Sequence, residues 1–295
     1  MPMRSAVAAA TGLLLGMSAL ALTAAPAHAA SQQGLTRSTP ITIAHRGASG
    51  YAPENTLAAV NTADKLGFEW VENDVQRTKD GELVVIHDTT LTRTTDVEQV
   101  FPDRSPWNVR DFTAKEIARL DAGGWFSDAY AGEKVPTLDR YMKNLDRTGQ
   151  RLLLELKSPE LYPGIEAQTL KELGAQGWTD RKHLQSRLII QAFNADTIKT
   201  THTLNPTVKT GFLGNPKVSD LKSYAQFTDQ INPSYRAVTK DYVDAVHALK
   251  GPQGKQMEVF TWTVNDGSTA RTVDAAGVDG IITNFPDVVR EATRN

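Results

Sequence analysis

Ile41-Thr42-Ile43-Ala44-His45-Arg46-Gly47 is a short apolar run that ends directly in two ionisable side chains. The run Leu152-Leu153-Leu154 ends in the same way, in Glu155 and Lys157. Short β-rich runs of this kind alternate with helical patterns through most of the chain. This alternation predicts βαβ units, and therefore a parallel sheet with right-handed crossovers.

The same patterns place the individual elements. Strands are predicted at Ile41–His45, Phe68–Val75, Leu83–His87, Arg151–Lys157, Leu188–Phe193, Lys209–Leu213, Gln230–Pro233, Glu258–Val264 and Gly280–Thr283. Helices are predicted at Thr56–Leu66, Thr137–Arg147, Ile165–Leu173, Ala195–Leu204, Lys240–Leu249 and Thr269–Ala276. We therefore predict an α/β fold, a (β/α)₈ TIM barrel, with an open doubly wound sheet as the alternative.

One stretch interrupts the alternation. The strands Phe68–Val75 and Leu83–His87 are joined by Thr78-Lys79-Asp80-Gly81, whose Asp-Gly pair suits a hairpin or another tight connection. Residues 89–136 then show little periodic pattern. Because loops this long in compact domains are usually functional, we predict an insertion at about 89–136. It follows the strand ending at His87 and lies over one end of the barrel.

The first 29 residues have the order of a secretory signal peptide. Arg4 precedes an apolar run, and Ala27-His28-Ala29 is a small-x-small cleavage signal. Gly12 and Gly16 interrupt the run, which favours cleavage near Ala29 over a retained anchor. We expect a signal peptide at 1–29, a linker at 30–40, a barrel domain at 41–295 and secretion from the cell. The 266 residues left after cleavage suit one (β/α)₈ domain of about 250 residues.

The composition excludes several classes of protein. The net charge is −2 and no Lys/Arg-dense segment stands out, which argues against nucleic-acid binding. No second long apolar run occurs, so we expect no stable membrane anchor after cleavage. The chain has no cysteine, which excludes disulfides and thiolate metal sites. Any metal must therefore be held by oxygen or imidazole ligands.

Ionisable residues gather where the predicted strands end. A (β/α)₈ barrel carries its active site at the C-terminal ends of its strands, so these side chains should converge on one rim. They are His45, Arg46, Glu72, Asp74, His87, Asp88, Glu155 and Lys157. Side chains two residues apart share one face of a strand, so Glu72 and Asp74 should point the same way.

Three of these residues, Glu72, Asp74 and Glu155, predict a cation site. Their carboxylates would repel one another at the rim unless a divalent cation neutralised them, and an all-oxygen set suits Ca²⁺ or Mg²⁺ rather than Zn²⁺. We favour Ca²⁺ over Mg²⁺ because extracellular fluid is richer in it. Surface ion pairs with Lys and Arg are the structural alternative. They explain carboxylates that end apolar strands less well.

His45 and His87 are the candidates for acid–base chemistry. A single histidine at a strand end is more often structural, but two beside charged residues indicate a general acid and a general base. We assign no role to His202 and His247 in helical patterns, or to His183 in a polar connection. Arg46 and Lys157 add fixed positive charge that suits a phosphate oxyanion or, alternatively, a carboxylate.

Several short motifs follow one another between residue 41 and about residue 287. They are Ile43-Ala44-His45-Arg46-Gly47-Ala48, Pro53-Glu54-Asn55-Thr56, Glu72-Asn73-Asp74-Val75, Thr78-Lys79-Asp80-Gly81, His87-Asp88-Thr89-Thr90-Leu91-Thr92-Arg93-Thr94-Thr95, Val135-Pro136-Thr137-Leu138, Leu154-Glu155-Leu156-Lys157, Thr261-Trp262-Thr263-Val264-Asn265 and Thr283-Asn284-Phe285-Pro286. In this order they resemble the glycerophosphodiester phosphodiesterase family. Each motif is weak alone, whereas the ordered set is highly specific.

The resemblance implies metal-dependent hydrolysis of glycerophosphodiesters to sn-glycerol 3-phosphate and an alcohol, on a (β/α)₈ barrel with an insertion after His87. It implies the following site residues: His45 and His87 as the acid–base pair, Glu72, Asp74 and Glu155 as cation ligands, Arg46 and Lys157 as phosphate contacts, Glu54 as a supporting polar group, and Phe193 and Trp262 as aromatic walls. From the bare sequence, the two aromatic residues are instead expected in the core. Asn284 stands where the family commonly has Asp, which changes local hydrogen bonding.

Several alternatives stay open at this stage. The attacking oxygen is either water or the substrate's own 2-hydroxyl, which would give a cyclic phosphate, and the order of the two histidines is undecided. The substrate is a small glycerophosphodiester or a glycerol-phosphate wall polymer such as teichoic acid, a choice that we expect the insertion to influence. The other candidates are a phospholipase similar to sphingomyelinase D and a catalytically silent binding protein.

Overall fold

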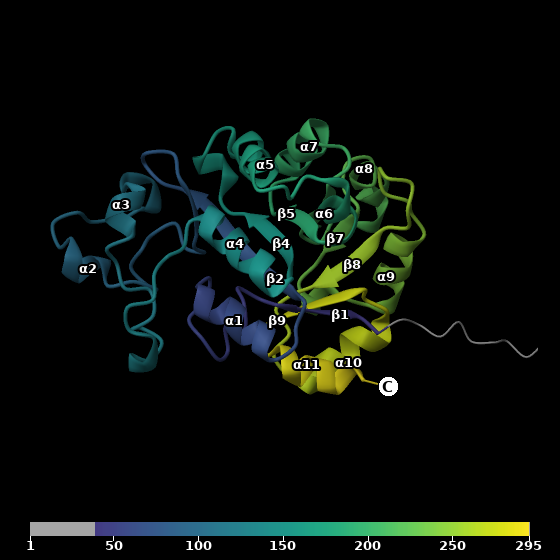
Figure 1. Ribbon diagram of the computed structural model, residues 1–295. Coiled ribbons are helices and arrows are strands. Elements are labelled where there is room, and N and C mark those ends of the chain that lie inside the picture. The colour runs from purple at the N-terminus through teal and green to yellow at the C-terminus, as the bar shows by residue number, and fades with distance from the viewer. Residues whose placement is uncertain (1–38, 295) are drawn as a thin grey trace, which may run out of the picture. The chain divides into compact units, whose positions relative to one another are not determined.

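Eight parallel strands form a closed ring in the computed structural model, which describes residues 39–294 (Figure 1). They are β1 (Ile41–Ala44), β2 (Trp70–Arg77), β4 (Arg151–Leu156), β5 (Leu188–Ala192), β6 (Lys209–Leu213), β7 (Gln230–Asn232), β8 (Glu258–Thr261) and β9 (Gly280–Thr283). β1 pairs with β9 on one side and with β2 on the other, and this pairing closes the ring. The predicted (β/α)₈ barrel is therefore confirmed, and the open sheet is excluded.

Helices cover the outside of the ring (Figure 1). They are α1 (Leu57–Lys65), α4 (Leu138–Thr148), α5 (Ile165–Ala175), α6 (Arg181–Ser186), α7 (Ala195–Leu204), α8 (Leu221–Tyr224), α9 (Lys240–His247), α10 (Gly267–Ala276) and α11 (Pro286–Thr293). Short 3₁₀ turns in these connections are η3 (Pro159–Leu161), η4 (Val218–Asp220) and η5 (Tyr235–Ala237). Side-chain caps start several helices, as at Thr56, Thr137 and Asn194, because the cap oxygen accepts from an otherwise unpaired backbone N–H.

Three of these helices, α6, α8 and α11, were not predicted. α6 and α8 are only one or two turns long, and α6 buries no side chain, so neither leaves a clear apolar stripe in the sequence. The expectation that His183 lies in a polar connection is wrong, because it lies in α6. Asp180 caps that helix by accepting a hydrogen bond from the His183 N–H at 2.8 Å.

Alternation along the strands divides the ring into an inside and an outside. Apolar side chains that point inward form one cluster within the barrel. Its members are Ile43, Trp70, Leu153, Ile189, Phe260 and Ile282. Since residues two apart share a face, His45, Glu72 and Glu155 lie directly beyond members of this cluster, on the same side. The inner core therefore forms a floor beneath the ionisable residues.

The strand register brings distant parts of the chain to one level. Ala44, the last residue of β1, is opposite Val71 in β2 and Thr283 in β9. The residues that come next in the three segments are His45, Glu72 and Asn284. Together they lie at the C-terminal end of the ring, where this fold carries its chemistry.

The remaining strand, β3 (Leu83–Val85), pairs antiparallel with the end of β2, so the predicted hairpin is confirmed. β2 begins two residues later than expected and extends two residues further, and β3 ends before His87. The early end of β3 is explained by Gln76. Its Nε2 donates to the carbonyl oxygens of Ile86, His87 and Asp88 at 2.9, 3.0 and 2.7 Å. A side chain, and not a further strand residue, satisfies these carbonyl groups.

The segment after β3 has a small core of its own. It contains α2 (Val97–Val100), η1 (Val109–Asp111), α3 (Ala114–Ile117) and η2 (Asp128–Tyr130), and its apolar side chains form a separate cluster. In Figure 1, α2 and α3 lie beside the barrel, on the left. Tyr130 donates from its hydroxyl to the carbonyl oxygen of Tyr51 at 3.0 Å, so the insertion contacts the loop after β1.

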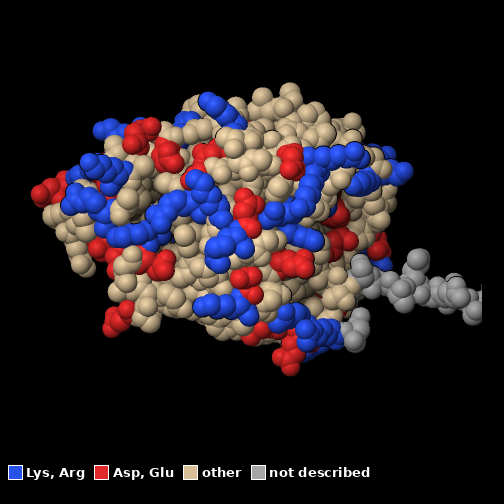
Figure 2. Space-filling view, in the orientation of Figure 1, with Lys and Arg blue, Asp and Glu red and all other residues tan. Residues whose placement is uncertain are grey.

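The predicted signal peptide at 1–29 lies outside the described residues, as does most of the linker at 30–40. Within residues 39–294 no helix combines the length and the apolar character that a membrane span requires. On the face drawn in Figure 2, basic and acidic side chains are interspersed over the described surface. That distribution agrees with the near-balanced net charge of −2.

Candidate active site

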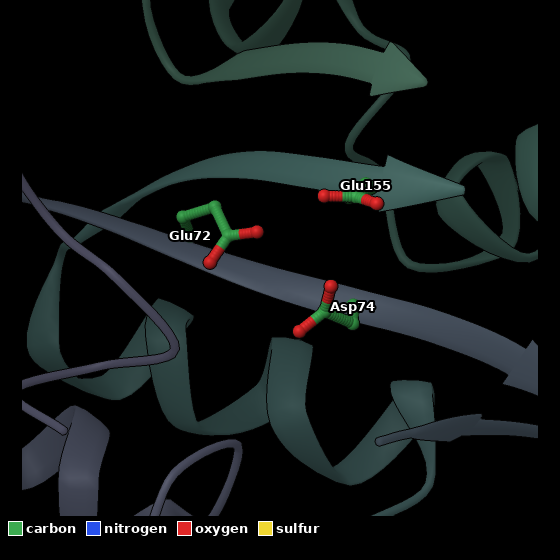
Figure 3. Close-up of side chains that lie close together, drawn as sticks. All are labelled: Glu72, Asp74 and Glu155. Atoms are coloured by element: carbon green, nitrogen blue, oxygen red, sulfur yellow. The ribbon is translucent and has the colours of Figure 1, made fainter. Parts of the chain in front are cut away.

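Three carboxylates lie together at the C-terminal end of the barrel (Figure 3). Glu72 and Asp74 come from β2, and Glu155 lies in β4 directly opposite Asp74. One oxygen of each residue lies within 4.8 Å of those of the other two, and all three residues are buried. The structure thus brings together the three residues predicted to hold a cation.

Burial and mutual repulsion disfavour the charged forms of two of these groups. Burial, together with Asp74 and Glu155, raises the pKa of Glu72 well above its ordinary value. Burial and the nearby Asp74 raise the pKa of Glu155 to about 7. Burial also acts to raise the pKa of Asp74, but cationic neighbours, Arg46 first among them, outweigh it and the net shift is downward.

This donor set fits a divalent cation. Asp74 Oδ1 is buried and has no hydrogen-bond partner, so it has unused acceptor capacity. All the donors are carboxylate oxygens, which hard cations such as Ca²⁺ and Mg²⁺ prefer. A bound divalent charge would reverse the upward pKa shifts of Glu72 and Glu155 and offset the repulsion among the three residues.

Arg46 borders the carboxylates on the side of β1. Its backbone is left-handed, at φ 56°, and its amide N–H donates to Glu72 Oε2 at 2.9 Å. Its Nε lies 3.3 Å from Asp74 Oδ2, and its Nη1 donates to Glu54 Oε1 at 2.8 Å. Asn55, with φ 60°, donates from Nδ2 to the same Asp74 oxygen at 2.8 Å. Such backbone angles persist in non-glycine residues only where neighbouring contacts hold them.

Lys157 borders the carboxylates on the side of β4. Its Nζ donates to Glu155 Oε1 at 2.9 Å and lies 3.9 Å from Asp74 Oδ1. Burial acts to lower the pKa of Lys157, but Glu155 and Asp74 outweigh it, so the net shift is upward and the amine stays charged. Arg46 and Lys157 therefore place one fixed positive charge each on opposite sides of the carboxylate cluster.

Two aromatic side chains form a further wall. Phe193 and Trp262 make an edge-to-face contact with ring centroids 5.4 Å apart, and Lys157 Nζ lies 5.4 Å from the Phe193 ring. The expectation that both residues belong to the core is wrong for Phe193, which is 48% exposed. It directly follows Ala192, the last residue of β5, so it leaves the sheet at the mouth of the barrel. Trp262 is partly buried and donates from Nε1 to the Asn232 carbonyl oxygen at 2.8 Å.

His45 lies directly after β1, and Asn284 fixes its ring. Nδ1 of His45 lies 2.6 Å from Oδ1 of Asn284. Because an amide oxygen only accepts, Nδ1 carries the hydrogen in the neutral ring and Nε2 is the free acceptor. Nε2 lies 3.9 Å from Glu72 Oε2. Burial, followed by the charge of Arg46, lowers the pKa of His45 to about 4.

His87 follows β3, and Asp88 fixes its ring. Nδ1 of His87 lies 2.6 Å from Asp88 Oδ1, so its Nε2 is likewise left for chemistry. Arg93 in turn donates to both oxygens of Asp88, from Nε at 2.7 Å and from Nη2 at 3.0 Å. Burial lowers the pKa of His87, and the charges of Asp74 and the hydrogen bond to Asp88 oppose that shift only in part.

These groups surround a pocket of about 100 Å³. Eight of the ten predicted site residues line it, namely His45, Arg46, Glu72, His87, Glu155, Lys157, Phe193 and Trp262. The other two, Glu54 and Asp74, contact Arg46. A larger cavity, of about 780 Å³, is lined by residues at the starts of β6 and β8, Lys209 and Glu258, and so lies at the opposite end of the barrel. Among the described residues, the carboxylate cluster of Glu72, Asp74 and Glu155 lies at the smaller pocket. The two candidate acid–base residues, His45 and His87, line the same pocket.

Several residues in contact with the site were assigned no role from the sequence, although Asp88 was expected at the rim. Asn55, Asp88, Arg93 and Asn284 all bind predicted site residues, and each lies within one of the quoted motifs, which is the signal that could have found them. Gln191 also lines the pocket. It lies within β5 opposite Glu155, and a single polar residue in an apolar strand gave no sign of its position.

Comparison with known proteins agrees with this geometry. A family model described as glycerophosphoryl diester phosphodiesterase family matches residues 45–288. The chain is 32% identical, over an alignment 301 residues long, to a glycerophosphodiester phosphodiesterase of Bacillus subtilis (strain 168). The alignment covers 95% of this chain and 96% of that one. It is 35% identical over 257 residues to a glycerophosphodiester phosphodiesterase of Caldanaerobacter subterraneus subsp. tengcongensis, covering 86% and 98%.

A solved structure is similar over the same region. It is that of an Oleispira antarctica phosphodiesterase in complex with the product sn-glycerol-3-phosphate. The TM-score is 0.73 at 28% sequence identity, and the match covers 86% of this chain and 96% of that one.

Proposed function

The chain belongs to the glycerophosphoryl diester phosphodiesterase family and is a glycerophosphodiester phosphodiesterase, and from this premise we propose how its residues carry out the hydrolysis. His45 and His87 are the general acid and base, and Glu72, Asp74 and Glu155 hold a divalent cation. The observation that carries this assignment is the buried carboxylate cluster with two histidines beside it, each held through Nδ1.

Arg46 and Lys157 bind the phosphate group. Both charges are fixed by carboxylate partners, Arg46 through Glu54 and Asp74 and Lys157 through Glu155. A bound divalent cation would supply further positive charge to the phosphate and so stabilise the negative charge that grows in the transition state. The cation is proposed to be Ca²⁺ in preference to Mg²⁺, on the ground of its extracellular abundance.

The two Nε2 atoms transfer the protons. One histidine takes the proton of the attacking oxygen while that oxygen forms its bond to phosphorus. The other, in its imidazolium form, gives the Nε2 proton to the departing alcohol oxygen as the old P–O bond breaks, so one ring gains the positive charge that the other loses. The attacking oxygen is water, or the 2-hydroxyl of the glycerol group, in which case water opens the resulting cyclic phosphate in a second step.

The alcohol group of the substrate is proposed to lie along Phe193. A groove of about 340 Å³ adjoins the pocket there and shares Glu155, Lys157 and Phe193 with it. Leu156, Ser158, Pro159, Glu160 and Asn194 complete its lining. An open groove beside a small phosphate pocket suits a substrate whose alcohol portion varies in size, from a small headgroup to the next unit of a glycerol-phosphate polymer.

The proposed compartment is extracellular. The support is the signal-peptide pattern of residues 1–29 alone, which has a charged start, an apolar middle and small residues at the end. An exported enzyme of this kind would meet deacylated phospholipids or wall polymers outside the cell. Amino-terminal sequencing of the protein recovered from culture medium tests this, and a start near Ala30 is the expected result.

The test of the function is release of glycerol 3-phosphate from glycerophosphocholine. We expect release that stops in EDTA and returns when Ca²⁺ or Mg²⁺ is added, and the metal that restores the higher rate identifies the better cofactor. Parallel assays use a glycerol-phosphate polymer and sphingomyelin at matched concentrations. Higher turnover of sphingomyelin than of any glycerophosphodiester would contradict the proposal, and binding without turnover of any substrate would indicate a silent binding protein.

A further inference from the structure

Arg93 connects two parts of the active site that come from different segments of the chain. Its guanidinium donates to both oxygens of Asp88, at 2.7 and 3.0 Å, and to both oxygens of Glu54, at 2.9 and 2.7 Å. Asp88 directly follows His87, whereas Glu54 lies in the loop between β1 and α1. One planar side chain therefore forms two bidentate pairs, a geometry that arginine provides and lysine does not.

Each carboxylate is shared with a proposed active-site residue. Asp88 Oδ1 accepts from His87 Nδ1 at 2.6 Å as well as from Arg93. Glu54 Oε1 accepts from Arg46 Nη1 at 2.8 Å as well as from Arg93. The orientation of the His87 ring and that of the Arg46 guanidinium are thus both set by oxygen atoms that Arg93 holds in place.

We infer that Arg93 is a positioning residue, which fixes His87 through Asp88 and Arg46 through Glu54 and so couples the insertion to the phosphate site. The inference rests on the proposed roles of His87 and Arg46. Arg93 does not line the pocket, and its side chain is 42% exposed, so it acts on the reaction only through its two partners. Bidentate pairs within a network can also add to stability, so thermal midpoints measured beside the kinetics separate its effect on catalysis from any effect on folding.

The two connections predict two separable kinetic effects. In Arg93→Gln, the Asp88 carboxylate loses its anchor and the His87 ring gains freedom, so kcat should fall by about 10-fold to 100-fold, the usual effect of removing a partner that orients a site residue. Glu54 loses its second cation and Arg46 shifts, so KM should rise several-fold. Arg93→Lys keeps the charge but not the double fork, and it should restore only part of the kcat.

Double variants test each connection alone. In an Asp88→Asn background, Arg93→Gln should raise KM without lowering kcat further. In a Glu54→Gln background, it should lower kcat without raising KM further. Equal effects of Arg93→Gln in the wild type, in Asp88→Asn and in Glu54→Gln would overturn the inference. They would show that Arg93 does not act through Asp88 and Glu54.

A matched control is Arg104→Gln. Arg104 also lies in the insertion, has a side chain that is 34% exposed and pairs with Glu116, away from the pocket. Its kcat and KM should stay within about twofold of the wild type, and the thermal midpoints of both variants should be similar. Normal kinetics in Arg93→Gln, or a loss that Arg104→Gln reproduces, would overturn the inference.

His87→Ala, assayed in parallel on glycerophosphocholine, separates this inference from the proposed function. An inactive His87→Ala with a normal Arg93→Gln would overturn only the role of Arg93. An active His87→Ala would overturn the proposed role of His87, and the role of Arg93 with it.

Discussion

His45 Nδ1 and Asn284 Oδ1 lie 2.6 Å apart, although the two residues are 239 positions apart in the chain. The closure of the ring makes this contact possible, because β1 and β9 are neighbours and their last residues, Ala44 and Thr283, are in register. An asparagine oxygen holds the His45 ring without adding a charge. The carboxylate of Asp88 holds His87 in the equivalent way but with a negative charge. The two histidines are therefore oriented alike and differ in their electrostatic surroundings.

Asn284→Ala should lower kcat by about 10-fold to 100-fold, because the His45 ring loses the partner that fixes its tautomer and orientation. Asn284→Asp should retain the hydrogen bond and add a negative charge, which raises the pKa of His45. If His45 is the base, the acidic limb of the kcat/KM profile should therefore move to higher pH. An Asn284→Ala variant with normal kcat would contradict this positioning role.

Replacing either proposed acid–base residue should reduce turnover while leaving folding intact. His45→Ala and His87→Ala should each lower kcat by about 10² to 10⁴, the usual contribution of a general acid or base. His247→Ala is the matched control, because His247 pairs with Asp279 just before β9, at the other end of the barrel. Near-normal turnover in either active-site variant, measured with saturating cation, would show that the assignment is wrong.

Glu155→Gln should weaken cation binding, since it removes one of three negative donors, and excess Ca²⁺ or Mg²⁺ should restore part of the activity. Glu160→Gln is the control, because Glu160 lines the adjoining groove and lies outside the carboxylate cluster. The measurement is the concentration of added cation that gives half-maximal activity. An unchanged value for Glu155→Gln would argue against Glu155 as a ligand.

Removing the cation should make stability fall as the pH rises. The pKa of Glu155 is raised to about 7, and that of Glu72 is raised as well, so the folded protein binds these protons more tightly than the unfolded chain, whose carboxyls titrate near pH 4.5. The contribution of these groups to stability is then fully present below about pH 4.5 and is lost as the pH rises through 7. The lowered pKa values of His45 and His87 act in the opposite direction, so any fall in the thermal midpoint from pH 5.5 to pH 8 in EDTA should be larger in the wild type than in Glu155→Gln.

Saturating Ca²⁺ should remove most of that difference, because the bound charge offsets the repulsion among the three carboxylates. Glu155→Gln should flatten the pH dependence in EDTA, since it removes one titrating group. An EDTA curve that is the same for the variant and the wild type would place the effect elsewhere in the protein.

Phe193→Ala should raise KM several-fold with little change in kcat or in thermal midpoint, because the ring is half exposed and forms a wall of the pocket beside Trp262 and Lys157. Trp125→Ala is the control. Trp125 is 41% exposed and makes an edge-to-face contact with Phe126, away from the pocket. Equal KM values for wild type and Phe193→Ala would show that the substrate does not contact this wall.

The sequence determined the barrel and most of the side chains at its mouth. Alternating strand and helix patterns fixed the order of the elements, and the period of two placed Glu72 and Asp74 on one face. Both signals are local, since they depend on which way successive side chains point along one strand. Strand-end residues such as His45 and Glu155 could be found for the same reason, although β2 and β3 end two residues away from their predicted ends.

The partners of these residues were decided only by the tertiary structure. That Asn284 holds His45 and that Arg93 joins Asp88 to Glu54 depend on contacts between separate segments of the chain, 239 and 39 residues apart. Polar side chains of this kind carry no periodic signal, because they respond to the geometry of one neighbour and not to a repeating apolar face. For His45 and Asn284 the ring must close before the two residues become neighbours, so no local pattern can encode their contact.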